Sequence, residues 1–308
     1  MQKQHQLVAE QNQPERIELL RAQRLFYARA KLHQNLFTIL ALLLPAIGLI
    51  FGAHFPQIRP YLGFGSILVL LLEVGIFSRM QRADCKRGAK VQEQFDTEVL
   101  QLDWNRLVAG AKVDAEEIHS ITANPPTTAE QESLKNWYEP IIGELPLPVG
   151  RLICQRTNVA YDLQVRRRYA SLLLWSAIVL FVALAGVGQY QGLTLNDIIL
   201  TMVLPVLPFA AFALREHRKQ GDTIETLEAL KAEIEKLWDR ALVGASSAEL
   251  TFGARAVQDA IFRHRASAPL VVDWLYTWLR KHQEDVTHHA AQKFVAVAKQ
   301  KLKIQGAQ

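Results

Sequence analysis

The sequence predicts an all-α membrane protein whose four transmembrane helices form two hairpins. Four apolar runs of 17 to 20 residues carry almost no charge, and they span residues 36–53, 61–77, 169–187 and 195–214. A helix of about 20 residues crosses a hydrocarbon core of roughly 30 Å, so each run has the length of one span. Basic residues flank the outer ends of each pair of runs, and no segment sustains the period-two alternation of strands.

Residues 1–35 precede the first run and are predicted to form one cytoplasmic helix. Pro14 suits the first turn of a helix, and no breaking residue follows before the apolar run begins. The first 16 residues hold no apolar core, so we expect no cleavable signal peptide.

The placement of Lys and Arg predicts the orientation of the two hairpins, residues 36–79 and 169–214. Basic residues lie before the first run, after the second, before the third and after the fourth, and Arg166, Arg167 and Arg168 form the densest flank. The two connections inside the hairpins hold one basic residue, Arg59. Because positive flanks stay in the cytoplasm, the protein is expected to be multi-pass with both termini cytoplasmic. These flanks largely explain the net charge of +5, so that charge is poor support for binding DNA or RNA.

The two other segments outside the membrane, residues 80–168 and 215–308, are predicted to be helical. Val91, Phe95 and Val99 recur at helical spacing directly after the second run. The last segment carries apolar residues spaced by three and four, which predict helix packing along one seam: Leu227, Leu230, Ile234, Leu237 and Ala241.

A short pattern recurs after each hairpin and predicts an internal duplication. The strings "WNRLVAGA" from Trp104 and "WDRALVGA" from Trp238 share a Trp, an Arg, and a Gly-Ala pair at the same spacing. Each half would then consist of a membrane hairpin, a descending helix, a glycine helix stop and a helical tail. Each Trp is expected to pack in the core where its helix ends.

The chain carries none of the usual catalytic motifs, so we expect no enzymatic activity. It has no phosphate-binding loop, no nucleophile elbow and no zinc-binding HExxH, and its two cysteines form no metal-binding pattern. We therefore expect no cofactor and no metal. Glu73 is the one carboxylate well inside an apolar run, and either a pore lining or a structural ion pair explains it.

Two polar clusters outside the spans are candidates for binding an anionic ligand. The first, "RLICQRTNVAYD", supplies Arg151, Arg156, Asn158, Tyr161 and Asp162 within a few helical turns. The second, "VQDAIFRHR", supplies Gln258, Asp259, Arg263 and Arg265. Arg pairs with phosphate through two parallel hydrogen bonds, and Tyr or Arg stacks on a base. The alternative for both clusters is a polar network that joins the cytoplasmic helices, with Asp162 or Asp259 paired to an Arg.

Three strings resemble the SMODS-associating four-transmembrane effector family, predicted pore-forming proteins of bacterial antiphage systems. They are "LLRAQRLFYARAK", "RLICQRTNVAYDLQVRRRY" and "RAVQDAIFRHRASAPLVVDWLY", and the resemblance extends from about Gln11 to Ala298. It implies a partner nucleotidyltransferase that makes a cyclic oligonucleotide during infection. That signal would trigger the effector to permeabilise the bacterial inner membrane.

The sequence therefore predicts a signal-triggered, membrane-disrupting effector, with the lipid bilayer and a cyclic oligonucleotide as its partners. Four spans from one copy enclose no wide pore, so a homo-oligomer is expected. A constitutive channel or transporter is one alternative, although it would carry more polar residues near the middle of the bilayer. A membrane-anchored helical scaffold for a partner protein is the other.

Overall fold

A computed structural model describes residues 7–51, 55–190, 192, 194–198 and 204–302, and this part of the chain is helical and contains no strand. The short elements are α1 (Leu7–Glu10), the 3₁₀ turn η1 (Pro56–Ile58), the π-helical turn η2 (Glu73–Phe77), α5 (Arg106–Ala109), α6 (Ala115–Ile121), α7 (Thr128–Glu132), the 3₁₀ turn η3 (Pro140–Glu144) and α9 (Leu195–Ile198). The longer helices are α2 (Pro14–Phe51), α3 (Arg59–Leu72), α4 (Ser78–Val99), α8 (Leu147–Tyr190), α10 (Leu204–Leu242), α11 (Ser247–Ser267) and α12 (Asp273–Lys301). The all-α prediction is confirmed.

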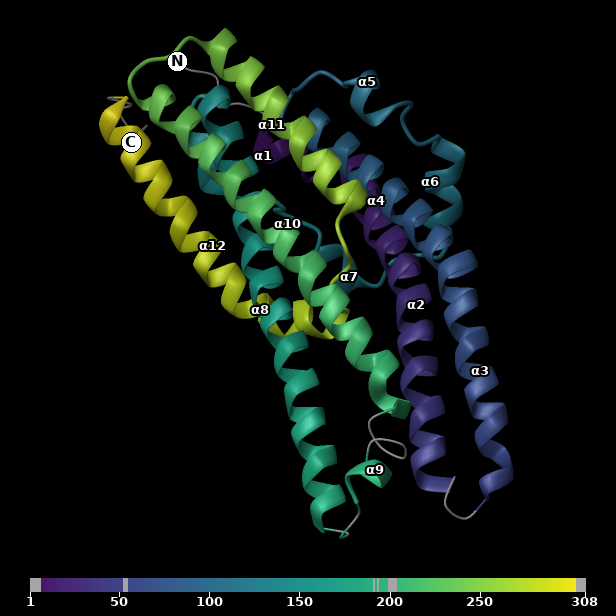
Figure 1. The fold of residues 1–308 in the computed structure, drawn as a ribbon. Helices are drawn as coiled ribbons and strands as arrows, with labels where there is room; N and C mark the ends of the chain where they lie inside the picture. The colour runs from purple at the N-terminus through teal and green to yellow at the C-terminus, as the bar shows by residue number, and fades with distance from the viewer. Residues whose placement is uncertain (1–6, 52–54, 191, 193, 199–203, 303–308) are drawn as a thin grey trace.

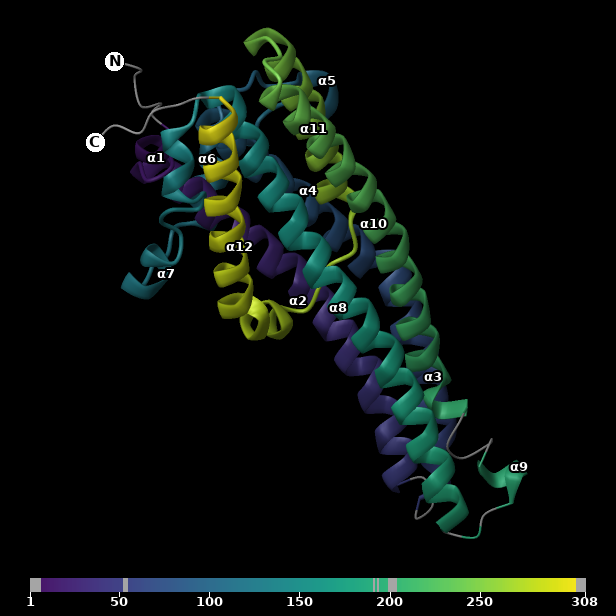
Figure 2. The ribbon, with the colours of Figure 1, turned by 90° about the vertical axis from the view of Figure 1, so that its left-hand side faces the viewer.

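Two pairs of long helices form the frame of the molecule. Helix α2 packs along α4, and α8 packs along α10. Helix α11 lies against α4, α8 and α10, while α12 lies against α8 (Figures 1 and 2). We call the region of α1, α4 to α7, α11, α12 and the adjoining halves of α2, α8 and α10 the polar part. The ends of α2, α8 and α10 project from it together with α3 (Figure 1).

The first and third predicted apolar runs lie on helices that continue into the polar part without a break. Helix α2 starts at Pro14, as predicted, and extends to Phe51, so it contains the first run up to that residue. Helix α8 extends over 44 residues and contains the whole third run. By length and composition, α8 is the one helix in the described ranges that qualifies as a candidate membrane span.

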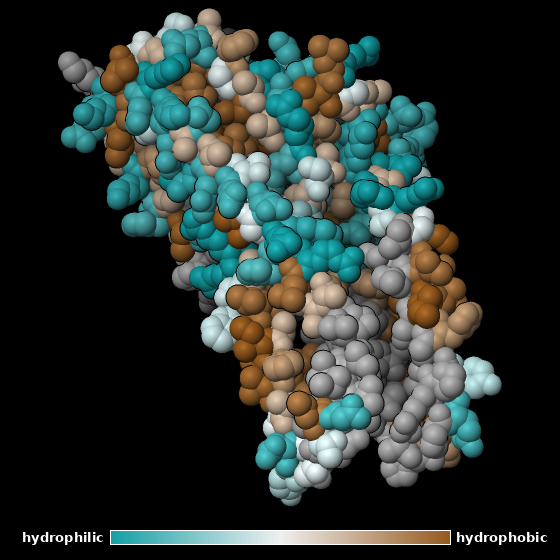
Figure 3. All heavy atoms as spheres, viewed as in Figure 1, coloured by the Kyte–Doolittle hydropathy of each residue, from teal (hydrophilic) through white to brown (hydrophobic). Residues whose placement is uncertain are grey.

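The projecting helices expose large apolar side chains. On α8 the exposed fraction is 61% for Trp175, 62% for Val179 and 61% for Phe181, and on α3 it is 70% for Phe64 and 64% for Leu71. A space-filling view shows brown, hydrophobic surface over α3 and the end of α8, and mostly teal surface over the polar part (Figure 3). Soluble monomers rarely expose a contiguous apolar area of this kind. We call these exposed side chains of α2, α3 and α8 the apolar belt.

The core of the polar part joins segments that are distant in the sequence. Phe95, Val99 and Leu100 from the end of α4 are fully buried together with Leu20 of α2 and Leu152 of α8. The seam predicted on residues 227–241 is also buried, except for Leu237, which is half-buried. Its first three members, Leu227, Leu230 and Ile234, pack on α8 and α11. Burial of these faces, at about 25 cal/mol per Å² of apolar surface, favours the close packing of α8, α10 and α11.

The two copies of the repeated Trp pattern share one structural feature, a glycine with positive φ just after a helix. Gly110 and Gly244 have φ values of +72° and +92°, and each follows the end of a helix. Glycine adopts a positive φ without the steric cost of a Cβ, although the ψ of −152° at Gly110 lies outside the left-handed helical region of the usual stop. The residues before it differ, because Trp104 lies in a loop after α4 whereas Trp238 lies inside α10 and is buried. The shared feature is therefore the stop and not the helix that precedes it.

Candidate functional site

The two polar clusters predicted from the sequence lie on neighbouring helices of the polar part. Residues 151–162 belong to α8 and residues 258–265 belong to α11, and both helices pack against each other. Helix α11 also packs on α4, so side chains from three helices meet between them. Figure 1 shows α11 beside α4 and α10 at the end of the molecule away from the apolar belt.

Two buried carboxylates of α4, Glu93 and Asp96, are the centre of this meeting point. Asp96 is 0% exposed and accepts hydrogen bonds from the Tyr138 hydroxyl at 2.6 Å, from Gln258 Nε2 at 3.0 Å and from the Arg265 guanidinium at 2.5 Å. Glu93 is 1% exposed and accepts from Arg255 at 2.6 Å and from Gln258 at 2.8 Å. Each carboxylate thus has its own arginine, which is what a buried charge requires.

Several predicted residues belong to this network. Gln258, which is fully buried, bonds both carboxylates and accepts from Gln155 of α8 at 3.0 Å. Asp259 pairs with Arg255 at 2.7 Å and accepts from Asn105 at 2.8 Å. Asn158 donates to the Tyr138 hydroxyl at 3.1 Å, and through it reaches Asp96. The structure therefore brings members of both predicted clusters together, around an acidic pair that the sequence analysis missed.

Arg151 lies at the other end of the same helix contact and stabilises the end of α4. Its guanidinium donates to the carbonyl oxygens of Leu100 and Gln101 and, at 2.9 Å, to the Thr251 hydroxyl. Gln101 has a φ of +52°, so the backbone leaves the helical conformation where Arg151 bonds it. A cation at a helix C-terminus also complements the helix dipole. Burial lowers the pKa of Arg151, opposed by Asp103.

The remaining predicted residues lie apart from the acidic pair. Arg156 forms an ion pair with Glu235 of α10 at 2.8 Å and lies 4.3 Å from the centre of the Phe294 ring. Asp162 accepts from Arg166 at 2.9 Å and contacts His264 of α11 at 2.6 Å. Tyr161 packs against an apolar cluster near the start of the third apolar run. Arg263 is exposed. Arg166, predicted as part of a topology flank, is itself buried and also bonds Gln220 and the Pro269 carbonyl.

The surroundings of these groups shift their pKa values in different directions. Burial raises the pKa of Glu93 to about 7, although hydrogen bonds from Arg255 and Gln258 oppose the shift. Burial also acts on Asp162, but the charges of Arg166 and His264 outweigh it and hold the pKa of Asp162 well below its usual range. For Arg265, burial is outweighed by the charge of Asp96, which raises the pKa of the guanidinium.

The polar clusters have two interpretations, a ligand site and a polar network between helices. The side-chain contacts in the structure agree with the polar network. Asp259 and Asp162 each pair with an arginine, as that interpretation requires. Ligand binding by the nine residues stays a prediction. The string "EQFD" does carry a signal for the acidic pair, because Glu93 and Asp96 are three residues apart and share a helix face.

Glu73 starts the π-helical turn η2, and its side chain lies outside the described part of the structure.

The fold and the apolar belt define a class of protein, a helical assembly with long helices that extend from a polar part into an exposed apolar end. A family model described as the SMODS-associating 4TM effector domain matches residues 5–294. The chain therefore belongs to the SMODS-associating 4TM effector family, as the sequence predicted. A probable CBASS effector molecule of Bacillus cereus (strain VD146) is 26% identical over 294 residues, which cover 91% of this chain and 94% of that relative. No solved structure matches the chain.

Removing the Arg265 charge should leave Asp96 buried without its cationic partner. We expect Arg265→Gln to lower the free energy of unfolding by about 3–5 kcal/mol, as when a buried ion pair loses one member. Arg263→Gln is the matched control, because Arg263 is exposed two residues earlier on the same helix, and its effect should stay within about 0.5 kcal/mol. Thermal unfolding of both variants in detergent measures the difference. Equal effects would contradict a central role for the Asp96–Arg265 pair.

The raised pKa of Glu93 predicts a pH dependence of stability with a definite sign. Folded Glu93 keeps its proton up to pH of about 7, whereas the unfolded residue releases it near its ordinary value of 4.5. The folded state then binds more protons between these values, so stability falls as pH rises through this window. Asp162 has the opposite shift, and its contribution is lost only at more acidic pH. Melting temperatures across pH 4.5 to 7.5 should fall less steeply for Glu93→Gln than for the parent, and identical slopes would refute the assignment.

Proposed function

We propose that this protein is an effector of bacterial antiphage defence that disrupts the inner membrane when a cyclic oligonucleotide binds to it. Membership of the SMODS-associating 4TM effector family supports the effector role. The relative from Bacillus cereus carries the name of a probable CBASS effector, which supports the same context. In this proposal a nucleotidyltransferase encoded with the effector makes the cyclic oligonucleotide after infection.

The observation that carries the membrane proposal is the apolar belt. Its residues include exposed Ile39 on α2, Phe64 on α3 and Val179 on α8, which would be costly in water and suit contact with lipid. We propose that the four apolar runs form two hairpins that enter from the cytoplasm, with both chain termini on that side. Helices α2, α8 and α10 then pass from the membrane directly into the polar part, so a rearrangement there moves the spans.

The spans of one copy are too few to line a wide opening, and we therefore propose that the active form is an oligomer. Glu73 is proposed to line the conducting path, because a carboxylate in an apolar run is costly unless it faces water or a cation. Its neutralisation in Glu73→Gln would then change the ion selectivity of the open state without changing the amount of protein in the membrane.

A lysine in the apolar belt tests whether the belt contacts lipid. Val179 of α8 is 62% exposed, and Val243 in the turn after α10 is 86% exposed. A lysine near the middle of a span costs about 2.5–3.5 kcal/mol on insertion. We expect Val179→Lys to reduce the protein recovered in carbonate-washed membranes, and Val243→Lys to leave it unchanged. Equal recovery of the two variants would argue against the membrane assignment of α8.

Dye release from vesicles tests the whole proposed function. The purified protein is reconstituted into dye-filled vesicles and titrated with cyclic di- and trinucleotides of adenine and guanine. At least one of these is expected to cause release, with a midpoint that depends on its concentration, since a ligand shifts an equilibrium by its differential affinity for the two states. Linear dinucleotides of the same bases serve as controls. Vesicles that stay sealed with every cyclic nucleotide would refute the trigger, and vesicles that leak without any nucleotide would favour a constitutive channel.

A further inference from the structure

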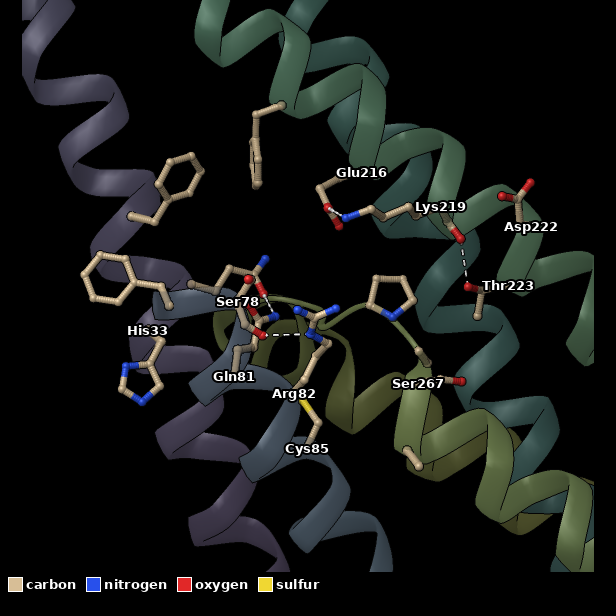
Figure 4. Close-up of a pocket in the computed structure, with 17 residues that line it drawn as sticks. His33, Ser78, Gln81, Arg82, Cys85, Glu216, Lys219, Asp222, Thr223 and Ser267 are labelled. Atoms are coloured by element: carbon tan, nitrogen blue, oxygen red, sulfur yellow. Dashed lines mark hydrogen bonds and ion pairs between the residues drawn. The ribbon is translucent and has the colours of Figure 1, made fainter. Parts of the chain in front are cut away.

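A cavity of about 410 Å³ lies between the two helix pairs, where the polar part meets the apolar belt. This volume is within the range of small-ligand sites, about 300–1,000 Å³. Four segments form its walls: α2, the end of η2 with the first turns of α4, α10, and the connection from α11 to α12 (Figure 4). No residue of the two predicted ligand clusters lines it.

The cavity contains a guanidinium group without an acidic partner. Arg82 of α4 donates one hydrogen bond, at 3.1 Å, to the carbonyl oxygen of Ser78 in its own helix. It forms no ion pair with any residue that the structure describes, and it is exposed. Two other arginines of this helix pair differ, because Arg29 of α2 and Arg87 of α4 both pair with Asp84, and Arg87 also pairs with Glu117. Figure 4 shows the Arg82 side chain extending into the space between α4 and α10.

The other residues that line the cavity are both polar and apolar. Lys219 of α10 forms an ion pair with buried Glu216 at 2.7 Å, and Asp222 lies exposed at the edge. Three aromatic rings also line the cavity, Phe37, Phe77 and Phe212, of which Phe37 and Phe212 meet edge to face at 5.8 Å. Since Glu216 neutralises Lys219, Arg82 is the wall residue with a positive charge to spare for an anion.

We propose that this cavity binds a phosphodiester anion, with the Arg82 guanidinium on the phosphate and the phenylalanine rings against the apolar part of the ligand. A guanidinium presents two parallel N–H groups that match two phosphate oxygens, and it stays charged at every relevant pH. Both a cyclic oligonucleotide and a phospholipid headgroup are phosphodiesters. The identification of the ligand as the activating signal rests on the proposed function, while the phosphodiester site does not.

The position of the cavity gives binding a direct effect on the helix pairs. Its walls come from both pairs and from the connection before α12, so a ligand that contacts all of them favours one relative arrangement. The π-helical turn η2 ends at Phe77, directly before Ser78 of the cavity wall. Such turns often occur at functional sites, and this one forms the end of the second apolar run, next to the cavity.

Binding to the full-length protein in detergent tests the proposal without a bilayer. Cyclic di- and trinucleotides of adenine and guanine are titrated by calorimetry, and retained phosphatidylglycerol is measured by native mass spectrometry. We expect Arg82→Gln to weaken binding about ten- to a hundredfold, as for the loss of a charge-assisted hydrogen bond. Arg82→Lys should fall between it and the parent, because an ammonium group keeps the charge and loses the paired geometry. Ser267→Trp, which fills the cavity from an exposed wall position, should also weaken binding.

Arg79→Gln is the matched control, because Arg79 is an exposed residue one turn earlier that carries the same charge and does not line the cavity. It should bind as the parent does. Loss of cyclic-nucleotide binding in Arg82→Gln identifies the cavity as the signal site, and loss of phosphatidylglycerol alone identifies a lipid headgroup site. A parent that binds neither, or an Arg82→Gln variant that binds both as the parent does, overturns the proposal. Loss of binding in Arg156→Ala with normal binding in Arg82→Gln would overturn it in favour of α8.

The two proposals fail in distinguishable ways. A parent that binds a cyclic nucleotide through Arg82 but releases no dye from vesicles leaves the cavity site standing and refutes membrane disruption. A parent that releases dye with the same concentration dependence as Arg82→Gln refutes the cavity as the site of the activating signal and leaves membrane disruption standing.

Discussion

The burial of two carboxylates on one face of α4 is the constraint on which the polar part depends. Glu93 and Asp96 are almost fully excluded from solvent. Transfer of a charged group from water to the protein interior costs several kcal/mol unless a partner compensates it. The compensation comes from α11, which supplies Arg255, Gln258 and Arg265. Because these bonds form only when α11 lies in one register against α4, the acidic pair determines where α11 packs. Tyr138, just before η3, donates a further hydrogen bond to Asp96.

The same network connects the polar part to the helices that continue into the apolar belt. Gln258 of α11 accepts a hydrogen bond from Gln155 of α8, and Arg156 of α8 pairs with Glu235 of α10. Helices α8 and α10 are continuous from these contacts to the level of the apolar runs. A rigid helix transmits a shift at one end to the other, so the polar network is suited to hold the two helix pairs in one arrangement.

The network and the cavity have different chemical properties, and this difference decides which suits a ligand. In the network the guanidinium groups of Arg151, Arg255 and Arg265 already bond carbonyls or carboxylates of the protein. A phosphate would have to displace those partners and leave buried charges unpaired, which costs more than a new contact supplies. Arg82 bonds one exposed carbonyl of its own helix, that of Ser78, and pairs with no carboxylate of the described residues. An unsaturated cation beside a cavity is therefore a better basis for recognition than a denser but internally satisfied cluster.

The sequence by itself determined the all-helical class, several features of the helices and the family, because these depend on local patterns. The helix start at Pro14, the buried seam on residues 227–241 and the glycine stops at Gly110 and Gly244 all follow from residue spacing or backbone preference. Only the tertiary structure decided the partners of the polar side chains. Asp96 and Arg265 are 169 residues apart, and nothing in either local string indicates the other. Likewise, Arg82 looks like one more basic flank in the sequence, and it is the packing of α10 and residues 266–269 around it that makes it the wall of a cavity.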